Sequence, residues 1–258
     1  MATGPQRAVG RLAVVSGGRQ GIGRAFAVRL AREGATVVVA DVAPSDDTVN
    51  LIVNEGYRAH GIQCDVTAPA AVAELAARTN DEFGPVDILV NNAGIYPVQH
   101  FLDVTYEDWR RVLSLNLDAP FLMAKAFVPE MMQRGWGRVV NVSSSAATFT
   151  ASNNTHYIAS KAGIEGFTRA LAADVGNRGV TVNAIVQGLT KTETTMAGDH
   201  ADAFDYFASM QAIARPGLPE DLANALAFLV SEDASFVTGH ALFVNGGMIK
   251  VGVEPRTH

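Results

Sequence analysis

The segment from residue 11 to residue 41 constrains the fold more than any other part of the sequence. An apolar run over 11–17 enters a glycine cluster, a helical pattern follows over 21–33, and a Val-rich run over 36–40 ends in Asp41. Strand, glycine turn, helix and strand in this order form a βαβ unit with parallel strands. Glycines at the turn allow the backbone to approach a pyrophosphate, and the free amides of the new helix face its negative charge. The segment therefore predicts a dinucleotide-binding unit.

The same alternation continues along the chain and predicts one α/β domain over residues 1–258. Apolar runs predict strands near 11–17, 36–41, 58–64, 87–91, 137–143, 180–186 and 241–244. Helical patterns lie near 21–33, 45–55, 69–83, 105–134, 155–176 and 219–231. We expect a single doubly wound Rossmann-type domain, with a seven-stranded parallel sheet and helices on both faces. The one long irregular stretch, about 189–218, is the expected substrate lid.

The glycine cluster is Gly-x-x-x-Gly-x-Gly, at Gly17, Gly21 and Gly23. This spacing departs from the better-known Gly-x-Gly-x-x-Gly, so its position between a strand and a helix carries the interpretation. Asp41 at the end of the second strand can hold both hydroxyls of an adenosine ribose and would repel a 2′-phosphate. Arg19 in the loop favours the opposite choice, but no second cation follows Asp41. We therefore expect NAD rather than NADP.

Tyr157 and Lys161 lie four residues apart on a predicted helix and project from one face. A free tyrosine has a pKa of about 10, and a nearby cation lowers that value by stabilising the phenolate. Such a pair suits carbonyl and alcohol chemistry. Alone, however, this spacing is more typical of a surface pair.

Six motifs in order resemble the short-chain dehydrogenase/reductase family over nearly the whole chain. They are the turn Gly17–Gly23, Asp65-Val66, Asn91-Asn92-Ala93-Gly94, Asn116 within Leu-Asn-Leu, Ser144 thirteen residues before Tyr157 with Lys161, and the last strand from Thr238 to Gly247. The likeness is greatest to NAD-dependent secondary-alcohol dehydrogenases, the 1-phenylethanol dehydrogenases among them. It is carried by the stretches 91–97, 121–129 and 155–157.

The resemblance implies a role for each catalytic residue. Tyr157 as phenolate would take the hydroxyl proton of an alcohol, and in the reverse direction it would donate one. Lys161 would lower the pKa of Tyr157 and hold the nicotinamide ribose, and Ser144 would hydrogen-bond the substrate oxygen. Asn116 would orient a water between Lys161 and solvent, although an Asn in this setting is more often a structural residue. Ser143 and Ser145 leave the serine assignment open by one position.

The expected cofactor site combines the glycine loop with residues carried over from the family. It comprises Gly17, Arg19, Gln20, Gly21, Ile22, Gly23, Asp41, Asp65, Val66, Asn92, Ala93, Gly94, Tyr157, Lys161, Gln187, Gly188, Thr190 and Thr192. Gln187 departs from the family, which normally has Pro before Gly188. Pro would fix the backbone φ, whereas Gln relaxes the backbone there and adds an amide that could reach cofactor or substrate.

Residues of the lid bear on the substrate. An apolar stripe recurs every three residues at Phe204, Phe207, Met210 and Ile213, and packing against the sheet is as plausible as a pocket wall. Four acids and no Lys or Arg lie from 193 to 214: Glu193, Asp199, Asp202 and Asp205. We expect a small neutral alcohol or ketone held by apolar contact, in a site formed by Ser144, Tyr157, Phe207, Met210 and Tyr96, and we expect a carboxylate to be repelled.

Bulk properties narrow the partners and the compartment. A net charge of −6 argues against nucleic acid and anionic membranes. Cys64 is the only cysteine and the six His are scattered, so we expect no disulfide and no metal site. Residues 1–10 contain no apolar segment typical of a leader and no apolar run approaches 18 residues, so we expect neither a leader nor a membrane span. The expectation is a cytoplasmic enzyme. The resemblance implies a homotetramer, and the apolar, glycine-rich strand 241–249, which would otherwise leave an exposed edge, favours contact with another copy.

Two other functions stay open at this point. The first is a 3-oxoacyl thioester reductase of the same family, which Asp41 and the acidic lid argue against. The second is a non-catalytic dinucleotide sensor, which could dispense with Tyr157 and Lys161, whereas this chain keeps both.

Overall fold

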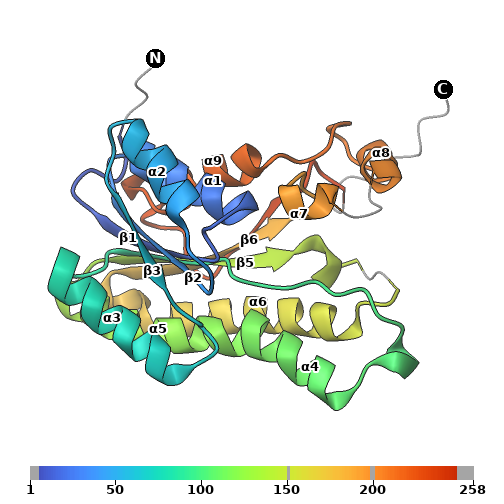
Figure 1. Cartoon of the computed structure of the whole chain (residues 1–258), viewed down its shortest axis with the longest axis horizontal. Helices are drawn as coiled ribbons and strands as arrows, with labels where there is room; N and C mark the ends of the chain where they lie inside the picture. The colour runs from blue at the N-terminus through green and yellow to red at the C-terminus, as the bar shows by residue number, and fades with distance from the viewer. Residues whose placement is uncertain (1–5, 150–151, 198–200, 249–258) are drawn as a thin grey trace.

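The computed structural model describes residues 6–149, 152–197 and 201–248, and it contains one seven-stranded parallel sheet (Figure 1). The strand order is β3-β2-β1-β4-β5-β6-β7, so the order reverses between β1 and β4. The strands are β1 (Leu12–Ser16), β2 (Thr36–Asp41), β3 (Ala59–Gln63), β4 (Ile88–Asn91), β5 (Gly137–Ser144), β6 (Val180–Gln187) and β7 (Ala241–Val244). The predicted α/β fold is confirmed.

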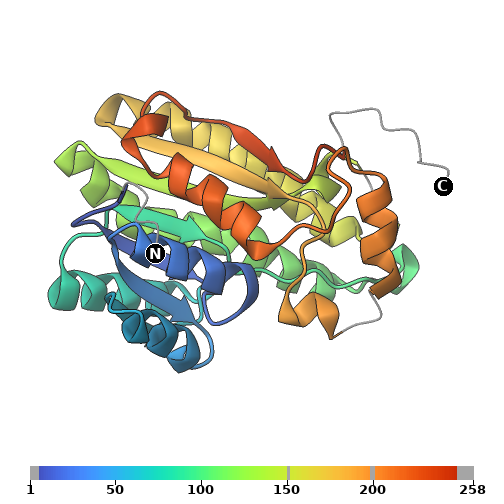
Figure 2. The same ribbon diagram turned by 90° about the horizontal axis from the view of Figure 1, so that it is seen from above.

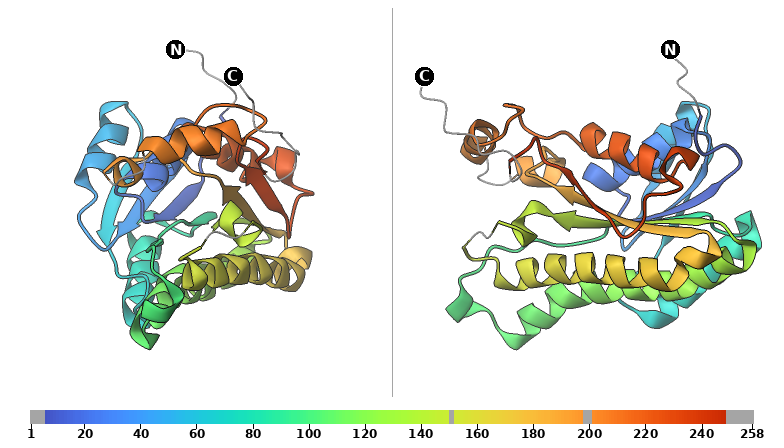
Figure 3. Two further views of the ribbon diagram at one scale, coloured as in Figure 1. Left: turned by 90° about the vertical axis from the view of Figure 1, so that its right-hand side faces the viewer. Right: turned by 180° about the vertical axis from the view of Figure 1, so that it is seen from behind.

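Helices cover both faces of this sheet (Figures 1 and 3). One face carries α1 (Gly21–Arg32), α2 (Asp46–Asn54) and α9 (Pro219–Leu229). The opposite face carries α3 (Pro69–Phe83), α4 (Tyr106–Leu113), α5 (Ala119–Arg134) and α6 (Thr155–Val175). Seen from above, the short helices α7 (Glu193–Met196) and α8 (Ala201–Ser209) lie toward the end of the sheet where β5 and β6 finish (Figure 2).

The two faces of the sheet bury separate apolar clusters, and β1 shows the division. Ala13 and Val15 pack in the cluster that contains Phe26 of α1, while Leu12 and Val14 pack in the cluster of α3 and α5. Ala13, Val14 and Val15 are all 0% exposed. A strand buried on both faces needs no polar alternation, which explains the continuous apolar runs of the sequence.

The predicted single helix over 105–134 is interrupted by a π-helical segment, Ser114–Asp118, between α4 and α5. Local π-helix is frequent at functional sites, and here it carries the buried Asn116. The helical span Tyr106–Arg134 also has the length of a candidate membrane span, with an 18-residue window of mean hydropathy 1.2, which the sequence analysis did not anticipate. Its contacts with α3, α6 and β5 explain this apolar composition.

The lid is more regular than expected, because α7 and α8 both lie within 189–218. Thr192 begins α7 with a capping box: its hydroxyl accepts from the Thr195 N–H at 3.2 Å, and Thr195 Oγ1 accepts from the Thr192 N–H at 2.8 Å. Phe204 anchors α8 at 2% exposure, which the apolar stripe predicted for a helical segment. The signal missed in the sequence was therefore the spacing of Thr192 and Thr195, whose hydroxyls satisfy the first backbone amides of α7.

Candidate active site

A cleft of about 460 Å³ opens at the carboxyl ends of the strands, at the point where the strand order reverses. Parallel α/β sheets bind ligands at this position. Most of the predicted cofactor residues line it: Gly17, Arg19, Gln20, Gly21, Ile22, Gly23, Asp41, Asp65, Val66, Asn92, Ala93, Gly94, Tyr157, Lys161, Gln187 and Thr192. Tyr96, predicted to contact substrate, lines it as well. The topology thus brings together segments separated by 170 residues (from Gly17 to Gln187).

The glycine loop is shaped by close backbone approach. Gly17 has φ +65°, and a Cβ there would lie 2.8 Å from Ala93 Cα. A Cβ on Gly23 would collide with the Gly17 carbonyl group. The Asn92 amide fixes the loop from the next strand, donating to the carbonyls of Ser16 at 3.0 Å and Gly17 at 2.9 Å. These contacts leave the loop bare of side chains where an elongated anion would lie.

The amino end of α1 is already in contact with an anion, the carboxylate of Glu193. Its Oε2 accepts from the Gly21 N–H at 3.1 Å, and its Oε1 pairs with Arg24 Nη1 at 2.8 Å. The carboxylate stands where helix amides and the helix dipole favour a phosphate, so the loop fits a pyrophosphate. Glu193, expected to repel substrate from the lid, faces the glycine loop instead.

Asp41 is held at the end of β2 by two backbone amides. Its carboxylate accepts from the N–H of Arg19 and the N–H of Ala43, each at 3.2 Å. The acid is thereby tied to the glycine loop and faces the cleft. Thr67, which the sequence analysis missed, also lines the cleft, and its hydroxyl donates to Asp65 Oδ1 at 2.7 Å. The Asp-Val-Thr run could have revealed it, since Thr and Asp two residues apart often form such a turn.

Tyr157 and Lys161 are both buried, at 8% and 5% exposure, on the first turns of α6. Lys161 Nζ donates to the Val142 carbonyl at 2.8 Å and lies 5.8 Å from the centre of the Tyr157 ring. Burial lowers the pKa of Lys161 to about 8.

The expected lowering of the Tyr157 pKa is wrong for the protein alone. Burial of the phenol raises the pKa of Tyr157, and it outweighs the opposing hydrogen-bond contributions of Ser144 and Gln187. Lys161 is not among the groups that shift it. The physical reason is that a phenol nearly closed off from water pays a desolvation cost on ionisation that exceeds those contributions.

Ser144 and Asn116 are not among the residues that line the cleft. Ser144 ends β5, is 9% exposed, and its Oγ accepts from the Ala146 N–H at 3.2 Å. The Asn116 amide donates to the Ile95 carbonyl at 2.9 Å and to Ser160 Oγ at 3.1 Å, and its Oδ1 accepts from the Ile95 N–H at 2.9 Å. The side chain of Asn116 is therefore engaged in fixing the loop after β4.

Several predicted residues lie elsewhere. Gly188 and Thr190 line a separate cavity of about 280 Å³, on the far side of the β6 end. Phe207 and Met210 are half-buried but do not line the cleft, and Phe207 packs edge to face on Phe149 with ring centres 6.4 Å apart. Asp199 and the side chain of Asp202 lie outside the described residues. Just before the acids, the lid carries Lys191, whose Nζ lies 5.4 Å from the Phe204 ring centre.

Within the described part of the chain, no group of three His, Cys, Asp or Glu residues could hold a metal ion. The cleft joins a glycine loop that fits an anion, the carboxylate of Asp41 and a buried phenol beside a desolvated ammonium. Arg19 and Lys161 are the only cations among the described residues that line it. This arrangement can hold a dinucleotide and move a proton at the Tyr157 oxygen.

Comparisons with known proteins agree with this geometry. Residues 17–249 match the family described as Enoyl-(Acyl carrier protein) reductase. The chain is 37% identical to the 3-oxoacyl-[acyl-carrier-protein] reductase FabG of Escherichia coli over 243 residues, 94% of this chain and 98% of that protein. It is 41% identical to the cis-4-hydroxycyclohexanecarboxylate dehydrogenase of Sinomonas cyclohexanicum over 245 residues, 93% of this chain and 97% of that protein.

Solved structures show the same relationship. A protein described as an NAD(P) dependent gluconate 5-dehydrogenase from Beutenbergia cavernae, with bound NADP, matches with a TM-score of 0.90 at 36% identity. The match covers 96% of this chain and 100% of that one.

Proposed function

The chain belongs to the short-chain dehydrogenase/reductase family, and on that premise we propose that it is an NAD-dependent oxidoreductase interconverting hydrophobic, neutral secondary alcohols and their ketones. The carrying observation is the buried Tyr157–Lys161 pair at the carboxyl end of the sheet, in a cleft whose nearby walls include Ile95, Tyr96 and Leu115. An apolar wall beside one proton-transfer group suits an alcohol without charged substituents.

Each residue of the site has a separate part in this chemistry. A bound nicotinamide supplies the hydride acceptor or donor. Tyr157, as the phenolate, accepts the hydroxyl proton of the alcohol, and in the reverse direction the phenol donates it to the ketone oxygen. Ser144 hydrogen-bonds the substrate oxygen beside Tyr157. Lys161 holds the ribose, and the charge of its ammonium group stabilises the phenolate. This stabilisation is not among the contributions to the pKa of Tyr157 in the protein alone.

The preference for NAD rests on Asp41. Its carboxylate is fixed by two amides at the adenosine end of the cleft, and the next residue, Val42, offers no cation. We expect kcat/KM with NAD to exceed that with NADP by at least tenfold, about 1.4 kcal/mol. Asp41→Ala should shrink this ratio, because the repulsion of a 2′-phosphate is lost. Equal kcat/KM with both cofactors in the unmutated enzyme would overturn the assignment.

The substrate class is tested by a panel of alcohols and ketones. The Sinomonas relative is named for an alicyclic secondary alcohol that carries a carboxylate; its ring supports ring-bearing substrates for this chain, whereas its charge does not support neutral ones. We expect 1-phenylethanol and monocyclic or bicyclic alcohols to be oxidised with NAD, and the matching ketones to be reduced with NADH. Cis-4-hydroxycyclohexanecarboxylate against its carboxylate-free analogue isolates the effect of the charge. Preference for a hydroxy acid or a sugar over every neutral alcohol would reject the substrate class and keep the oxidoreductase.

Reduction of a 3-oxoacyl thioester is the second candidate, favoured by the 37% identity to FabG over nearly the whole of both proteins. Lys191 in the lid also weakens the argument that an anionic carrier would meet only acids. An acetoacetyl thioester with NADPH separates the two functions. Turnover of this pair that exceeds turnover of all neutral ketones with NADH would make the second candidate the function.

We also propose that the protein is a cytoplasmic homotetramer. Strand β7 is the sheet edge and its four residues are only half-buried, so pairing with another copy would cover the edge. Residue 249 of the stretch predicted for this contact lies outside the described residues. Light scattering at micromolar concentration should give a multiple of 27.2 kDa, and a particle of 27.2 kDa alone would reject it. Cell fractionation tests the compartment.

A further inference from the structure

Gln187 is the last residue of β6, and the strand register pairs it directly with Ser144, the last residue of β5. The two side chains therefore leave neighbouring strands at the same edge of the sheet. Gln187 lines the cleft together with Tyr157 and Lys161. This position carries Pro in the family that the sequence resembles, and Pro has no side-chain donor or acceptor. The chain has thus added an amide beside its proton-transfer group.

The polar atoms of this amide are unevenly satisfied. Gln187 Oε1 is buried and has no hydrogen-bond partner among the described residues. A buried acceptor without a partner is costly, and such atoms call for an explanation in functional terms. Hydrogen bonding from Gln187, like that from Ser144, lowers the pKa of Tyr157 against the effect of burial. The register with Ser144 and the shared cleft place the amide close to Tyr157, and its carbonyl oxygen remains available to a donor group of a bound ligand.

We propose that Gln187 is a further catalytic residue, whose amide N–H donates to the Tyr157 oxygen and stabilises the phenolate as a second donor beside Ser144. The inference rests on the proposed function, because the phenolate matters only if Tyr157 transfers the proton. During alcohol oxidation the O–H proton passes to the phenolate, the C–H bond breaks with its electron pair passing as hydride to NAD, and the carbonyl forms. Gln187 is neither oxidised nor protonated in this step. It increases the fraction of enzyme that starts with an ionised Tyr157.

Other titratable groups near Tyr157 do not duplicate this role. Lys161 of the same helix donates to Val142 and is desolvated. Tyr96, from the loop after β4, lies edge to face with its ring centre 6.5 Å from that of Tyr157 and raises its pKa. His156 is buried, with Nδ1 accepting from the Tyr157 N–H at 2.9 Å, so it contacts the backbone of Tyr157. Gln187 is the one residue of β6 that lines the cleft with Tyr157, and its amide is a neutral donor.

The test compares Gln187→Met, which keeps the length of the side chain and removes the amide, with the unmutated enzyme. Ultraviolet titration of each protein against its own Tyr157→Phe counterpart isolates the ionisation of Tyr157 among the five tyrosines, without any substrate. We expect Gln187→Met to move this ionisation to higher pH. The acid limb of kcat/KM for alcohol oxidation should move by about one pH unit in the same direction, so that kcat/KM falls about tenfold below the limb and recovers above it.

The controls separate this role from a structural one. Gln63→Met removes the amide at the end of β3, where it donates to the Val42 carbonyl at 2.7 Å, away from Tyr157, and should leave both titrations unchanged. Gln187→Asn keeps an amide and should restore part of the shift. A loss of kcat/KM that is equal at every pH would show a structural role and reject the inference.

The outcomes also distinguish this inference from the proposed function. An unchanged Tyr157 titration in a Gln187→Met enzyme that oxidises alcohols normally would reject the inference alone. A shifted titration in a protein that turns over no alcohol or ketone of the panel would reject the proposed function and retain the contact between Gln187 and Tyr157.

Discussion

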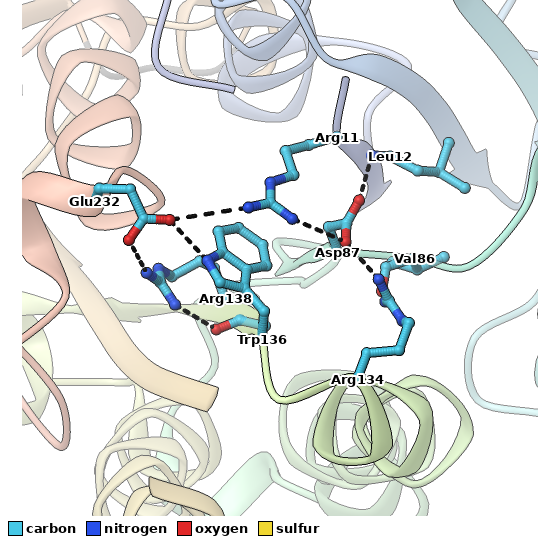
Figure 4. A network of polar contacts seen from close by, with 9 residues as sticks. Arg11, Leu12, Val86, Asp87, Arg134, Trp136, Arg138 and Glu232 are labelled. Atoms are coloured by element: carbon cyan, nitrogen blue, oxygen red, sulfur yellow. Dashed lines mark hydrogen bonds and ion pairs between the residues drawn. The ribbon is translucent and has the colours of Figure 1, made fainter. Parts of the chain in front are cut away.

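The two ends of the sheet treat their polar groups in opposite ways. At the carboxyl ends, Lys161 is buried beside a phenol that burial keeps protonated, and Gln187 leaves its carbonyl oxygen unpaired. At the amino ends, buried and half-buried charges are joined into a network that links β1, β4, β5 and the segment after α9 (Figure 4). The amino ends thus pair most of their charges, whereas at the carboxyl ends Lys161 has no ion pair among the described residues, although Arg24 and Glu193 do pair there.

Asp87 lies at the centre of the amino-end network. Its carboxylate accepts from the Leu12 N–H at 3.0 Å and from Arg134 Nη1 at 2.6 Å, and it pairs with Arg11 at 3.5 Å. The Trp136 ring lies between two guanidinium groups, 3.5 Å from that of Arg11 and 4.3 Å from that of Arg138 (Figure 4). In this network the Arg138 Nε is the buried atom without a partner.

Glu232 closes the network from the other side. It accepts from Trp136 Nε1 at 2.7 Å and pairs with Arg138 at 3.3 Å (Figure 4). Paired charges at the amino ends connect neighbouring strands, whereas the unpaired polar groups at the carboxyl ends cost stability and remain available to a ligand. Substitutions at the two ends should therefore separate stability from activity.

The largest effect is expected from Tyr157→Phe. The phenol oxygen is the only atom removed, and general acid–base catalysis contributes about 10² to 10⁴ in rate. We expect kcat to fall by at least 100-fold while NADH binding, measured by fluorescence, and the melting temperature stay close to those of the unmutated protein. Tyr96→Phe is the matched control and should be mild. Retention of more than a tenth of kcat would place the proton transfer elsewhere.

Asp87→Ala should show the reverse pattern. It leaves Arg134 and the Leu12 amide without their acceptor, and breaking a buried pair costs about 3 to 5 kcal/mol. Because Arg11 and Arg134, the two arginines that pair with Asp87, are partly exposed, we expect the free energy of unfolding to fall by about 3 kcal/mol. Urea unfolding measures this loss, and kcat/KM per folded enzyme should be unchanged. Glu82→Ala breaks the exposed pair with Arg78 and should cost under about 0.5 kcal/mol. A large loss of kcat/KM in Asp87→Ala would join the two ends functionally.

The two ends also differ in how far the sequence predicts them. The fold, the glycine loop and the Tyr157–Lys161 pair follow from local patterns, because strand periodicity and residue spacing are short-range properties. The network at Asp87 joins residues up to 221 positions apart, such as the paired Arg11 and Glu232, and only the strand order brings them together. The hydrogen bond between Glu193 and Gly21 and the π-helical turn at Asn116 also do not follow from local patterns. The desolvation of Tyr157 depends on tertiary burial, so the direction of its pKa shift could not be predicted from local patterns and the expected lowering was wrong.

Lys161→Met should stabilise the protein while impairing it as an enzyme. Burial of the ammonium lowers the pKa of Lys161 from 10.5 to about 8, so the folded state at pH 7 carries a desolvated charge. Removing that charge, with the loss of one hydrogen bond to Val142, should raise the free energy of unfolding by roughly 1 to 2 kcal/mol at pH 7.

The effect of Lys161→Met on stability should depend on pH. Between about pH 8 and pH 10.5 the unfolded chain keeps the Lys161 proton while the folded chain loses it, so the stability of the unmutated protein rises with pH in this window. Methionine has no such gain, and its advantage should shrink there. Urea unfolding of both proteins at one concentration, at pH 7 and pH 9.5, measures the difference. A variant that is less stable at pH 7 would show that Lys161 is stabilising, like the charges of the amino end.

The smallest effect is expected from Glu193→Gln, which changes a charge pair inside the cleft. The Glu193 carboxylate occupies the amino end of α1 and neutralises Arg24, whereas a pyrophosphate would need both. Glu193→Gln keeps the shape, removes the competing charge and frees the guanidinium. We therefore expect NADH to bind about five-fold more tightly, or about 1 kcal/mol, with a larger gain at low salt because the effect is electrostatic. Asp205→Asn removes an acid from α8, whose carboxylate is not part of the cleft lining, and should leave the affinity unchanged. Weaker NADH binding in Glu193→Gln would mean that the carboxylate supports the bound state, and the cleft end would then resemble the amino end in keeping its charges paired.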